Sequence, residues 1–396
     1  MQYDIITIGG GLGGASLAKA MAERGSRVLV IERETVFKDR VRGEALVPWG
    51  VGEAQELGLY DLLSQGCGHE VPWVDLYLGP NQIAHRNFPE TTSQRMPMMN
   101  FYHPRMQETL IRAAAAAGAD IRRGTTVQAI KPGKPPSVRI EINGKVEEIS
   151  ARLIVGADGR VSLARKWGDF TVHHDDPNFI LAGIWLNDVN APDDTSLILT
   201  NPGNGKGAYL FPQGNGCARA YAAYLASSDY RIQGSFEDFA KEFTSAGGPA
   251  EIFEGAKPNG PVASFDCADS YTPHPYKNGV ALVGDAAAST DPTWGQGLCL
   301  TLRDVRVLRD CLSSTDDWDK AADDYATEHD RHYEVIHTVI QWMREIMMWP
   351  GPAADAVRAK AMPLIAADMM RVPDHIFSGP DLPFNAEVKA RFYGEI

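Results

Sequence analysis

Short runs of Ile, Val and Leu near the start of the chain predict two buried strands with a helix between them. Residues 4–8 and 27–31 are dominated by these apolar side chains, as expected for strands covered on both faces of a sheet. Residues 15–24 have the composition of a helix, and Gly25 ends it. A strand, a helix and a second strand in this order predict a compact βαβ unit.

Two later apolar runs have the same character, and each leads into a turn that contains an aspartate. The run at 153–156 precedes Asp158, and the run at 279–283 precedes Asp285. A loop rich in proline and glycine follows the second turn, and a helix is predicted from about residue 298 to 311. Taken alone, either aspartate is more readily explained as a turn residue than as a ligand contact.

The middle of the chain follows a different pattern. Short stretches alternate between apolar and polar residues, as a half-buried antiparallel sheet requires. These stretches are residues 180–186, 197–200, 209–212 and 217–224. Residues 318–396 are predicted to be mostly helical and then irregular.

Composition limits the protein to ordinary globular classes. A length of 396 residues corresponds to about two to three domains, and 44% hydrophobic with 22% charged residues is typical of a soluble protein. The net charge of −13 argues against a nucleic-acid or anionic membrane partner, because both need a basic surface. Five scattered cysteines, no apolar run of about 18 residues and no signal peptide predict a cytoplasmic protein without a membrane span.

The loop after the first strand carries a dinucleotide-binding fingerprint. Gly9, Gly11 and Gly14 give the spacing G-x-G-x-x-G, and Glu32 stands at the end of the second strand. Gly9 allows a tight turn, Gly11 lets a pyrophosphate approach the backbone, and Gly14 lets the helix pack closely on the sheet. The helix N-terminus attracts the anion, and Glu32 is placed to accept hydrogen bonds from ribose hydroxyls. The fingerprint does not distinguish NAD from FAD, but the βα repeats of a typical dehydrogenase do not continue beyond it.

The ordered motifs together resemble the FAD-dependent monooxygenases of the para-hydroxybenzoate hydroxylase-like family. They are the glycine fingerprint, the turns at Asp158 and Asp285, and the loop Pro292-x-x-Gly295-x-Gly297. The resemblance covers roughly residues 1–310. Flavin-dependent halogenases resemble this fold too, but their W-x-W-x-I-P signature is absent here, which disfavours halogenation.

The resemblance implies an α/β fold built from two domains and a C-terminal extension. A Rossmann-like FAD-binding domain of the glutathione reductase type would be discontinuous, and an antiparallel-sheet substrate domain would be inserted into it. The segments expected for the FAD-binding domain are 1–74, 98–172 and 266–317. Those expected for the substrate domain are 75–97 and 173–265, and residues 318–396 would form the helical extension.

The resemblance also implies which residues hold the adenine half and the phosphates of FAD. Glu32 is expected at the adenosine ribose, with Arg33 near the adenosine phosphate. Arg42 and Arg105 are expected to reach the pyrophosphate or the ribityl chain.

The flavin half of FAD is expected near the later motifs. Asp285 would bind the ribityl hydroxyls, and Asp158 would orient its loop between FAD and the path of the reductant. The residues expected to lie against the isoalloxazine ring are Pro292, Gly295, Gly297 and Leu298. Backbone N–H groups at the start of the helix that follows would stabilise an anionic reduced flavin.

Aromatic residues on the predicted middle strands are candidates for the substrate wall, with burial in the core as the alternative for each. The candidates are Trp185, Tyr209, Phe211, Tyr221, Tyr224 and Trp294. No acid–base group is evident, so the catalytic residues stay unidentified beyond the flavin-facing loop with Pro292, Trp294 and Gly295. No metal site is expected, because neither His173-His174 nor the pair His329 and His332 has a third ligand at an ordinary spacing.

The implied function is a single-component monooxygenase. NAD(P)H would reduce FAD, molecular oxygen would form a flavin C4a-hydroperoxide, and one oxygen atom would pass to an apolar or aromatic small molecule. The alternative on the same scaffold is a flavin-dependent double-bond reductase, or an oxygen-independent enzyme that uses reduced FAD. A protein that only holds FAD is a third possibility. The expected state is a monomer or a homodimer.

Overall fold

A six-stranded sheet forms the core of one half of the molecule. The computed structural model describes residues 3–41, 43–142, 144–232 and 234–396. β1 (Ile5–Ile8) lies at the centre of the sheet between β2 and β12, and both neighbours run parallel to it. All four residues of β1 are buried, as expected for a strand covered by helices on both faces. In spatial order the strands are β21 (Tyr276–Lys277), β22 (Val280–Leu282), β12 (Leu153–Gly156), β1, β2 (Val28–Glu32) and β8 (Asp120–Arg123).

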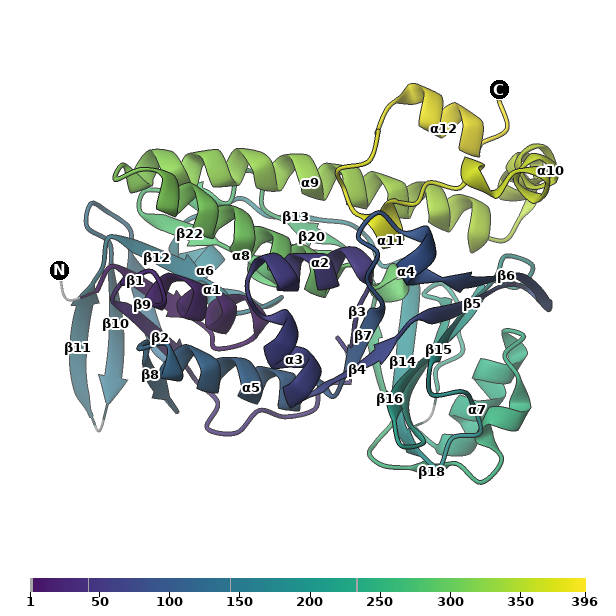
Figure 1. The fold of residues 1–396 in the computed structure, drawn as a ribbon, viewed down its shortest axis with the longest axis horizontal. Helices are drawn as coiled ribbons and strands as arrows, with labels where there is room; N and C mark the ends of the chain where they lie inside the picture. Colours follow the sequence, from purple (N-terminus) through teal and green to yellow (C-terminus); the bar gives the residue numbers. More distant parts are fainter. Residues whose placement is uncertain (1–2, 42, 143, 233) are drawn as a thin grey trace.

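Helices pack on this sheet and carry its connections (Figure 1). α1 (Leu12–Ala22) begins three residues before the predicted helix, because the glycine turn itself forms its first turn. Two short helices, α2 (Pro48–Glu56) and α3 (Tyr60–Gly66), follow one another between residues 48 and 66, and Gly58 adopts a positive φ of 66° between them. The helices are α1, α2, α3, α5 (His103–Ala116), α6 (Leu163–Trp167) and α8 (Gly297–Ser314).

An eight-stranded sheet forms the core of the other half of the molecule. Its strands are longer than the sequence pattern predicts, and β14, β16 and β17 each span nine residues. Antiparallel pairing dominates, but β15 pairs parallel with β5. The strands are β18 (Lys257–Pro258), β14 (Phe179–Asn187), β17 (Cys217–Leu225), β16 (Lys206–Gly214), β15 (Thr195–Asn201), β5 (Trp73–Leu78), β6 (Asn81–Asn87) and β19 (Ala263–Asp266). α7 (Phe236–Ser245) covers the outer face.

Three small sheets complete the strand pairing. One of them, β3–β7–β4, stands between the two large sheets in Figure 1. Its members are β3 (Ala45–Leu46), β7 (Met98–Phe101) and β4 (Gly68–Val71). The others are β9 (Val127–Lys131) with β10 (Ser137–Ile142) and β11 (Lys145–Ser150), and β13 (His173–His174) with β20 (Ser270–Tyr271) and β23 (Ala288–Ser289).

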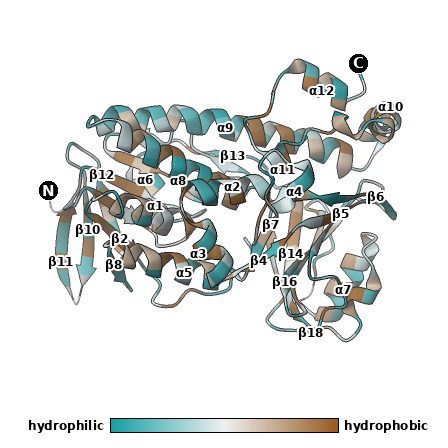
Figure 2. Ribbon diagram, in the orientation of Figure 1, coloured by the Kyte–Doolittle hydropathy of each residue, from teal (hydrophilic) through white to brown (hydrophobic). Residues whose placement is uncertain are grey.

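The C-terminal residues are helical, and the long α9 (Trp318–Met347) runs across both large sheets (Figure 1). Figure 2 shows apolar residues gathered on the inner strands, while β6 and β11 at opposite ends of the molecule are hydrophilic. The other helices are α4 (Phe88–Thr91), α10 (Pro352–Ala367), α11 (His375–Ser378) and α12 (Ala386–Phe392). The mixed α/β fold with a helical C-terminal segment, predicted from the sequence, is confirmed. Within the described residues, no helix is both long and apolar enough to cross a membrane.

Candidate active site

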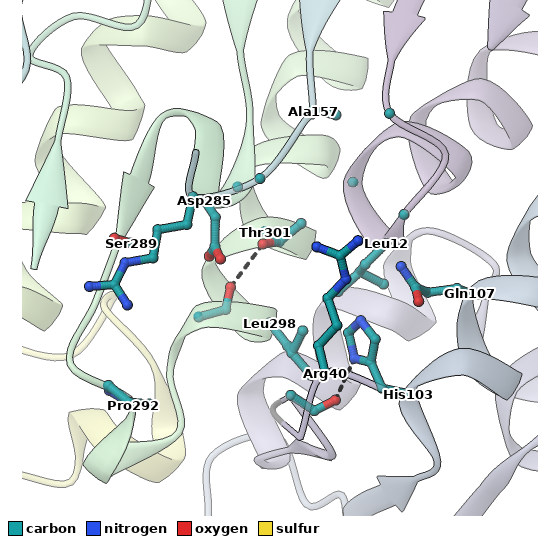
Figure 3. Close-up of a pocket in the computed structure, with 18 of the residues that line it drawn as sticks. Leu12, Arg40, His103, Gln107, Ala157, Asp285, Ser289, Pro292, Leu298 and Thr301 are labelled. Carbon is teal, nitrogen blue, oxygen red and sulfur yellow. Dashed lines mark hydrogen bonds between the residues drawn. The ribbon is translucent and has the colours of Figure 1, made fainter. Parts of the chain in front are cut away.

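A cavity of about 400 Å³ lies where the carboxyl ends of the parallel strands meet the eight-stranded sheet. Its wall includes residues that follow β1, β2, β12 and β22, which is where ligands bind in open parallel sheets. The opposite wall comes from β14, β15, β16 and β17. Figure 3 shows part of this cavity, with Asp285, Arg40 and Leu12 around one space.

The turn between β1 and α1 leaves room for a ligand at one glycine and none at the other two. A Cβ on Gly9 would lie 2.3 Å from the carbonyl oxygen of Ala157, and a Cβ on Gly14 would lie 1.9 Å from that of Gly9. At Gly11 the nearest atom would be Gln107 Nε2, at 3.4 Å. Gly9 and Gly14 therefore pack protein against protein, whereas Gly11 faces the cavity.

The start of α1 fits a pyrophosphate. Gly11 is the N-cap residue and offers no side-chain cap, and the first turn of the helix holds no acidic residue. The first N–H groups of a helix lack intrahelical partners and carry partial positive charge. Leu12 and Gly13 line the cavity, so this end of the helix adjoins the space that a phosphate group would fill.

Glu32 is held on the cavity wall by the loop that follows β2 and by the glycine turn. Its Oε2 accepts the N–H of Gly10 at 2.6 Å, and its Oε1 accepts the N–H of Glu34 at 2.7 Å. A carboxylate has about four acceptor sites, so both oxygens keep capacity for a ribose hydroxyl. Arg33 also lines the cavity, with an exposed side chain.

Only one of the two arginines expected at the phosphates belongs to the described residues. Arg42 lies outside the described residues. Arg105 is exposed and does not line the cavity, whereas His103 and Gln107 do. Those two residues stand one turn apart on α5, so the residue midway between them points to the other side of the helix.

Arg40 also lines the cavity, although the motifs did not single it out. Figure 3 shows its side chain extending toward Leu12. The sequence carried no signal for this arginine beyond its place two residues before Arg42.

The two predicted aspartates have different surroundings. Asp158 lines the cavity but turns its carboxylate to the start of α6, where it accepts the N–H groups of Leu163 and Ala164 at 2.8 and 3.0 Å. It therefore fixes the turn that carries it. Asp285 points into the cavity in Figure 3. The start of α8 is close to it, because a Cβ on Gly297 would lie 3.7 Å from Asp285 Oδ1.

The loop in front of α8 is anchored by a buried carboxylate. Asp291 is fully buried, and its Oδ1 accepts the N–H and hydroxyl of Thr293 at 2.9 and 2.7 Å. Its Oδ2 accepts Nη1 of Arg344 at 3.2 Å, and its own N–H donates to Asp269. Burial, and then the nearby Asp269 carboxylate, raise the pKa of Asp291. Gly295 ends this turn with a φ of 68°.

The residues of this loop that were expected to face the flavin all line the cavity. They are Pro292, Trp294, Gly295, Gly297 and Leu298. Two polar atoms on the same wall, Thr290 Oγ1 and Trp294 Nε1, are buried without a hydrogen-bond partner among the described residues. Buried polar groups normally have a partner. These atoms, the open space at Gly11 and the free start of α1 fit a bound dinucleotide.

Because side chains alternate along a strand, the aromatic candidates lie on two different faces of the sheet. Tyr209, Phe211 and Tyr221 line the cavity, and so does Trp294. Tyr224 is buried on the opposite face of the sheet with the core under α7, because successive side chains alternate between faces.

Trp185 does not line the cavity either. Its ring lies 4.9 Å from that of Tyr102 and 5.3 Å from the guanidinium of Arg219.

The C-terminal region also contributes to the cavity. Ile376 and Phe377 of α11 line it, more than 360 positions after the glycine turn along the chain. Gln296 links the two regions, since its Nε2 donates to the carbonyls of Trp294 and Ile376 at 2.6 and 3.1 Å. The sequence carried no signal for this contact.

Comparison with known proteins agrees with this geometry. The sequence profile described as "FAD binding domain" matches residues 2–334. The chain belongs to the FAD binding domain family. The resemblance to FAD-dependent monooxygenases of this family, predicted from the motifs, is confirmed.

The relatives that are similar in sequence include both oxygenases and reductases. The chain is 26% identical over 340 residues to squalene monooxygenase from Mus musculus, covering 81% of this chain and 56% of the relative. It is 27% identical over 311 residues to digeranylgeranylglycerophospholipid reductase from Methanosarcina acetivorans, covering 75% and 71%. The chain thus spans little more than half the length of the mouse protein.

Solved structures share the fold at low identity. A p-nitrophenol 4-monooxygenase, PnpA from Pseudomonas putida, superposes with a TM-score of 0.80 at 17% identity, covering 94% of this chain and 96% of that one. The probable FAD-dependent monooxygenase pqsL from Pseudomonas aeruginosa has a TM-score of 0.74 at 18% identity, covering 87% and 96%.

In this member of the FAD binding domain family, α9 also holds the turn that carries Asp285. Asp304 of α8 is buried, and its Oδ2 accepts the N–H of Gly284 at 2.8 Å. Its Oδ1 lies 2.8 Å from His329 Nδ1 and 2.9 Å from His332 Nε2. Asp304 is therefore the third potential ligand that the sequence did not show beside His329 and His332. Its oxygens serve as hydrogen-bond acceptors for both imidazoles and for the N–H of Gly284.

The same cluster predicts sensitivity to acid. Burial lowers the pKa of His332, so folding opposes its protonation. Burial alone would raise the pKa of Asp304, but the charge interaction with His329, and then hydrogen bonds from His329 and His332, hold it well below its ordinary value. Both shifts are downward, so both contributions to stability are lost as the pH falls. The contribution of His332 starts to be lost below about pH 6.5, the ordinary histidine value.

We expect the free energy of unfolding to fall by up to about 1.4 kcal/mol for each pH unit below that value on account of His332. Denaturant titrations across this range would measure it. His332→Gln is the matched control, since glutamine donates a hydrogen bond without titrating. Equal pH dependence in the two proteins would contradict this assignment, because all other groups are common to both.

Proposed function

We propose that this protein is an FAD-dependent monooxygenase that takes electrons from NAD(P)H and transfers one atom of molecular oxygen to an apolar or aromatic small molecule. The observation that carries the proposal is that one cavity includes both the dinucleotide turn and an aromatic wall. The loop from Pro292 to Leu298 lies on the same cavity. A cofactor held at the turn would thus present its reactive end to a substrate at the wall.

Each part of this wall has a physical role in holding FAD. The glycine turn and the start of α1 would bind the pyrophosphate, Glu32 the adenosine ribose, and Asp285 the ribityl hydroxyls. Once bound, FAD would supply the electron transfer and oxygen activation that side chains do not provide. The start of α8 at Gly297 has no acidic residue in its first turn, so its partial positive charge is available to an anionic ring.

The substrate side of the cavity would limit the entry of water. Apart from the tyrosine and tryptophan polar atoms, its described lining is largely apolar, and it includes Leu181, Ile198, Phe211, Phe265 and Phe377. An apolar wall beside the reacting end of the cofactor limits loss of reactive species to water. Such a wall suits a substrate that is itself mostly apolar. We infer a monomer or homodimer in the cytoplasm, with no nucleic-acid partner.

A double-bond reductase is the second candidate. Digeranylgeranylglycerophospholipid reductase and a menaquinone reductase from Mycobacterium tuberculosis, 24% identical over 343 residues, are among the relatives. An apolar chamber would serve such a reaction equally well. The two candidates differ in their need for oxygen.

The deciding experiment incubates the FAD-loaded protein with NADH or NADPH and a panel of apolar ring compounds and alkenes under isotopically labelled oxygen. We expect a substrate to accelerate NAD(P)H oxidation and to yield a product with one labelled oxygen atom. A reduced product formed equally well without oxygen would replace the monooxygenase by the reductase. If no compound accelerated oxidation and none changed, both proposals would be rejected.

A further inference from the structure

Three side chains from distant parts of the chain meet outside the cavity, next to α9. They are Asp175, just after β13, Asp269, just before β20, and His337 of α9. Backbone pairing brings the two aspartates together, because the N–H of Asp175 donates to the carbonyl oxygen of Asp269 at 3.0 Å. Figure 1 shows α9 passing over β13 and β20, and His337 contacts both carboxylates from there.

The distances within this cluster are those of ligands around one metal ion. His337 Nε2 lies 3.2 Å from Oδ2 of Asp175 and 3.5 Å from Oδ2 of Asp269. A charge-assisted hydrogen bond from nitrogen to a carboxylate is normally about 2.7–2.9 Å long. Tetrahedral zinc, with bonds of about 2.0–2.1 Å to nitrogen and oxygen, holds its ligand atoms about 3.3 Å apart. That separation lies between the two observed distances.

Hydrogen bonds alone do not satisfy His337 Nε2. It also lies 3.2 Å from Nε2 of Gln341, so three polar atoms surround a nitrogen that has either one hydrogen or one lone pair. With a hydrogen it meets the amide donor, and with a lone pair it meets two carboxylates. A half-turn of the amide would present its oxygen, and three acceptors would then share one hydrogen. A cation removes the conflict, because it binds the lone pair and the oxygens together.

The surroundings favour positive charge at this point. Burial alone would lower the pKa of His337, but the hydrogen bond and charge of Asp269, and then the charge of Asp175, raise it. Asp269 is 1% exposed, and it accepts the N–H of the fully buried Asp291. Among the described residues, Arg344 is the only arginine or lysine that pairs with any of these three carboxylates, and it reaches Asp291 alone. An ion at His337 would supply the charge that the other two lack.

A buried hydroxyl without a partner lies at the same cluster. Tyr333 is 5% exposed, and its ring stacks on that of His337 at 5.3 Å. Its hydroxyl has no hydrogen-bond partner among the described residues. Burial, and then the charges of Asp269 and Asp175, raise the pKa of Tyr333, so the phenol stays protonated. A hydroxyl in this place can donate to a ligand of the ion, such as a bound water.

We propose that Asp175, Asp269 and His337 bind a divalent transition-metal ion, with Zn²⁺ as the best match to one imidazole and two carboxylates at these distances. Water would fill the remaining position, since the side chain of Asp175 is 37% exposed and opens the cluster to solvent. Three distant segments supply the ligands, so no spacing in the sequence indicates the site. The inference does not rest on the proposed function, because none of the three residues lines the cavity.

The role of this ion is structural. It joins α9 to the segment before β20, and it fixes the carboxylate that supports the loop in front of α8. Oδ1 of Asp269 accepts the N–H of Asp291, and Asp291 in turn accepts the N–H of Thr293. With Oδ2 of Asp269 on the ion, Oδ1 keeps its place as the acceptor for Asp291.

The test measures binding of Zn²⁺ to the FAD-loaded protein after treatment with a chelator, by equilibrium dialysis and elemental analysis. We expect one ion per chain and a higher unfolding temperature with the ion than without it. Loss of an outer hydrogen-bond partner of a ligand already lowers metal affinity about 10–100-fold. Asp175→Asn and His337→Phe each remove a ligand, so each should lower the affinity at least about tenfold.

Two matched variants control for binding at the surface. Asp176→Asn and His174→Phe make the same changes on either side of Asp175, at exposed side chains outside the cluster. Both should bind the ion with wild-type affinity. Asp269 is left unchanged, because it also supports Asp291. Asp175→Asn carries the test even if His337→Phe folds poorly, since its side chain reaches solvent.

Three results would each overturn the site. They are less than one ion per chain in wild type, equal affinity in wild type and Asp175→Asn, and an equal loss in Asp175→Asn and Asp176→Asn. Loss of the ion in His332→Gln but not in His337→Phe would place it at Asp304 and would also reject the proposal. Because no measurement involves substrate, oxygen or NAD(P)H, a failed monooxygenase assay would leave the metal site standing.

Discussion

Gly14→Ala is expected to destabilise the protein severely and to leave it without bound FAD. The added Cβ would lie 1.9 Å from the carbonyl oxygen of Gly9 and 3.3 Å from Ala157 Cβ, so α1 would have to move away from the sheet. Overpacking of a rigid interior typically costs about 1–3 kcal/mol, and a collision with backbone belongs at the upper end. Thermal unfolding of the apoprotein and flavin absorbance per mole of purified protein would measure both effects.

Gly11→Ala is the matched control three residues away. Its Cβ would meet no protein atom closer than 3.4 Å and would instead occupy the cavity side of the turn. The apoprotein should unfold at the wild-type temperature, while affinity for FAD falls at least about tenfold, or ~1.4 kcal/mol. If Gly14→Ala kept wild-type stability, or if Gly11→Ala bound FAD normally, the division of roles between these glycines would be wrong.

Arg344→Met should have the second large effect, a loss of about 3–5 kcal/mol of unfolding free energy, as when one partner of a buried ion pair is removed. Arg344 is the cation that contacts the fully buried Asp291, and without it that carboxylate would face Asp269 uncompensated. The turn from Pro292 to Trp294 depends on Asp291, so FAD affinity should fall too. Denaturant unfolding and flavin titration would measure these losses.

Arg331→Met is the control on the same helix. Its side chain is 46% exposed and pairs with Glu328 and Asp381 at the surface. Exposed pairs contribute about 1 kcal/mol or less. The double variant Arg344→Met with Asp291→Asn should recover part of the stability, because no buried charge is then left unpaired. A double variant no more stable than Arg344→Met alone would contradict the ion-pair explanation.

Much of the dinucleotide side could be predicted from sequence because its constraints are local. Gly9 needs a positive φ and Gly14 a close approach of backbone, and each restricts one position to glycine. Glu32 follows from the length of the second strand, and the turn at Asp285 from the end of a buried strand. In each case a few consecutive residues carry the whole signal.

The substrate side could be predicted only as a set of aromatic candidates. Strand alternation separates Tyr221 from Tyr224, but which of the two faces the cavity depends on the helix that covers the other face. The position along a strand matters as well. Tyr209 lines the cavity and Trp185 does not, because only part of each strand borders the cavity.

The sequence by itself determined the βαβ unit, the glycine turn and the dinucleotide class of the cofactor, since each depends on near neighbours in the chain. Only the tertiary structure decided that Glu44 meets Tyr221, that Asp304 meets His329, and that α11 lines the cavity. The partners in the two pairs are 177 and 25 positions apart. Such contacts are selected by the packing of whole sheets and helices, and no short pattern of residues encodes them.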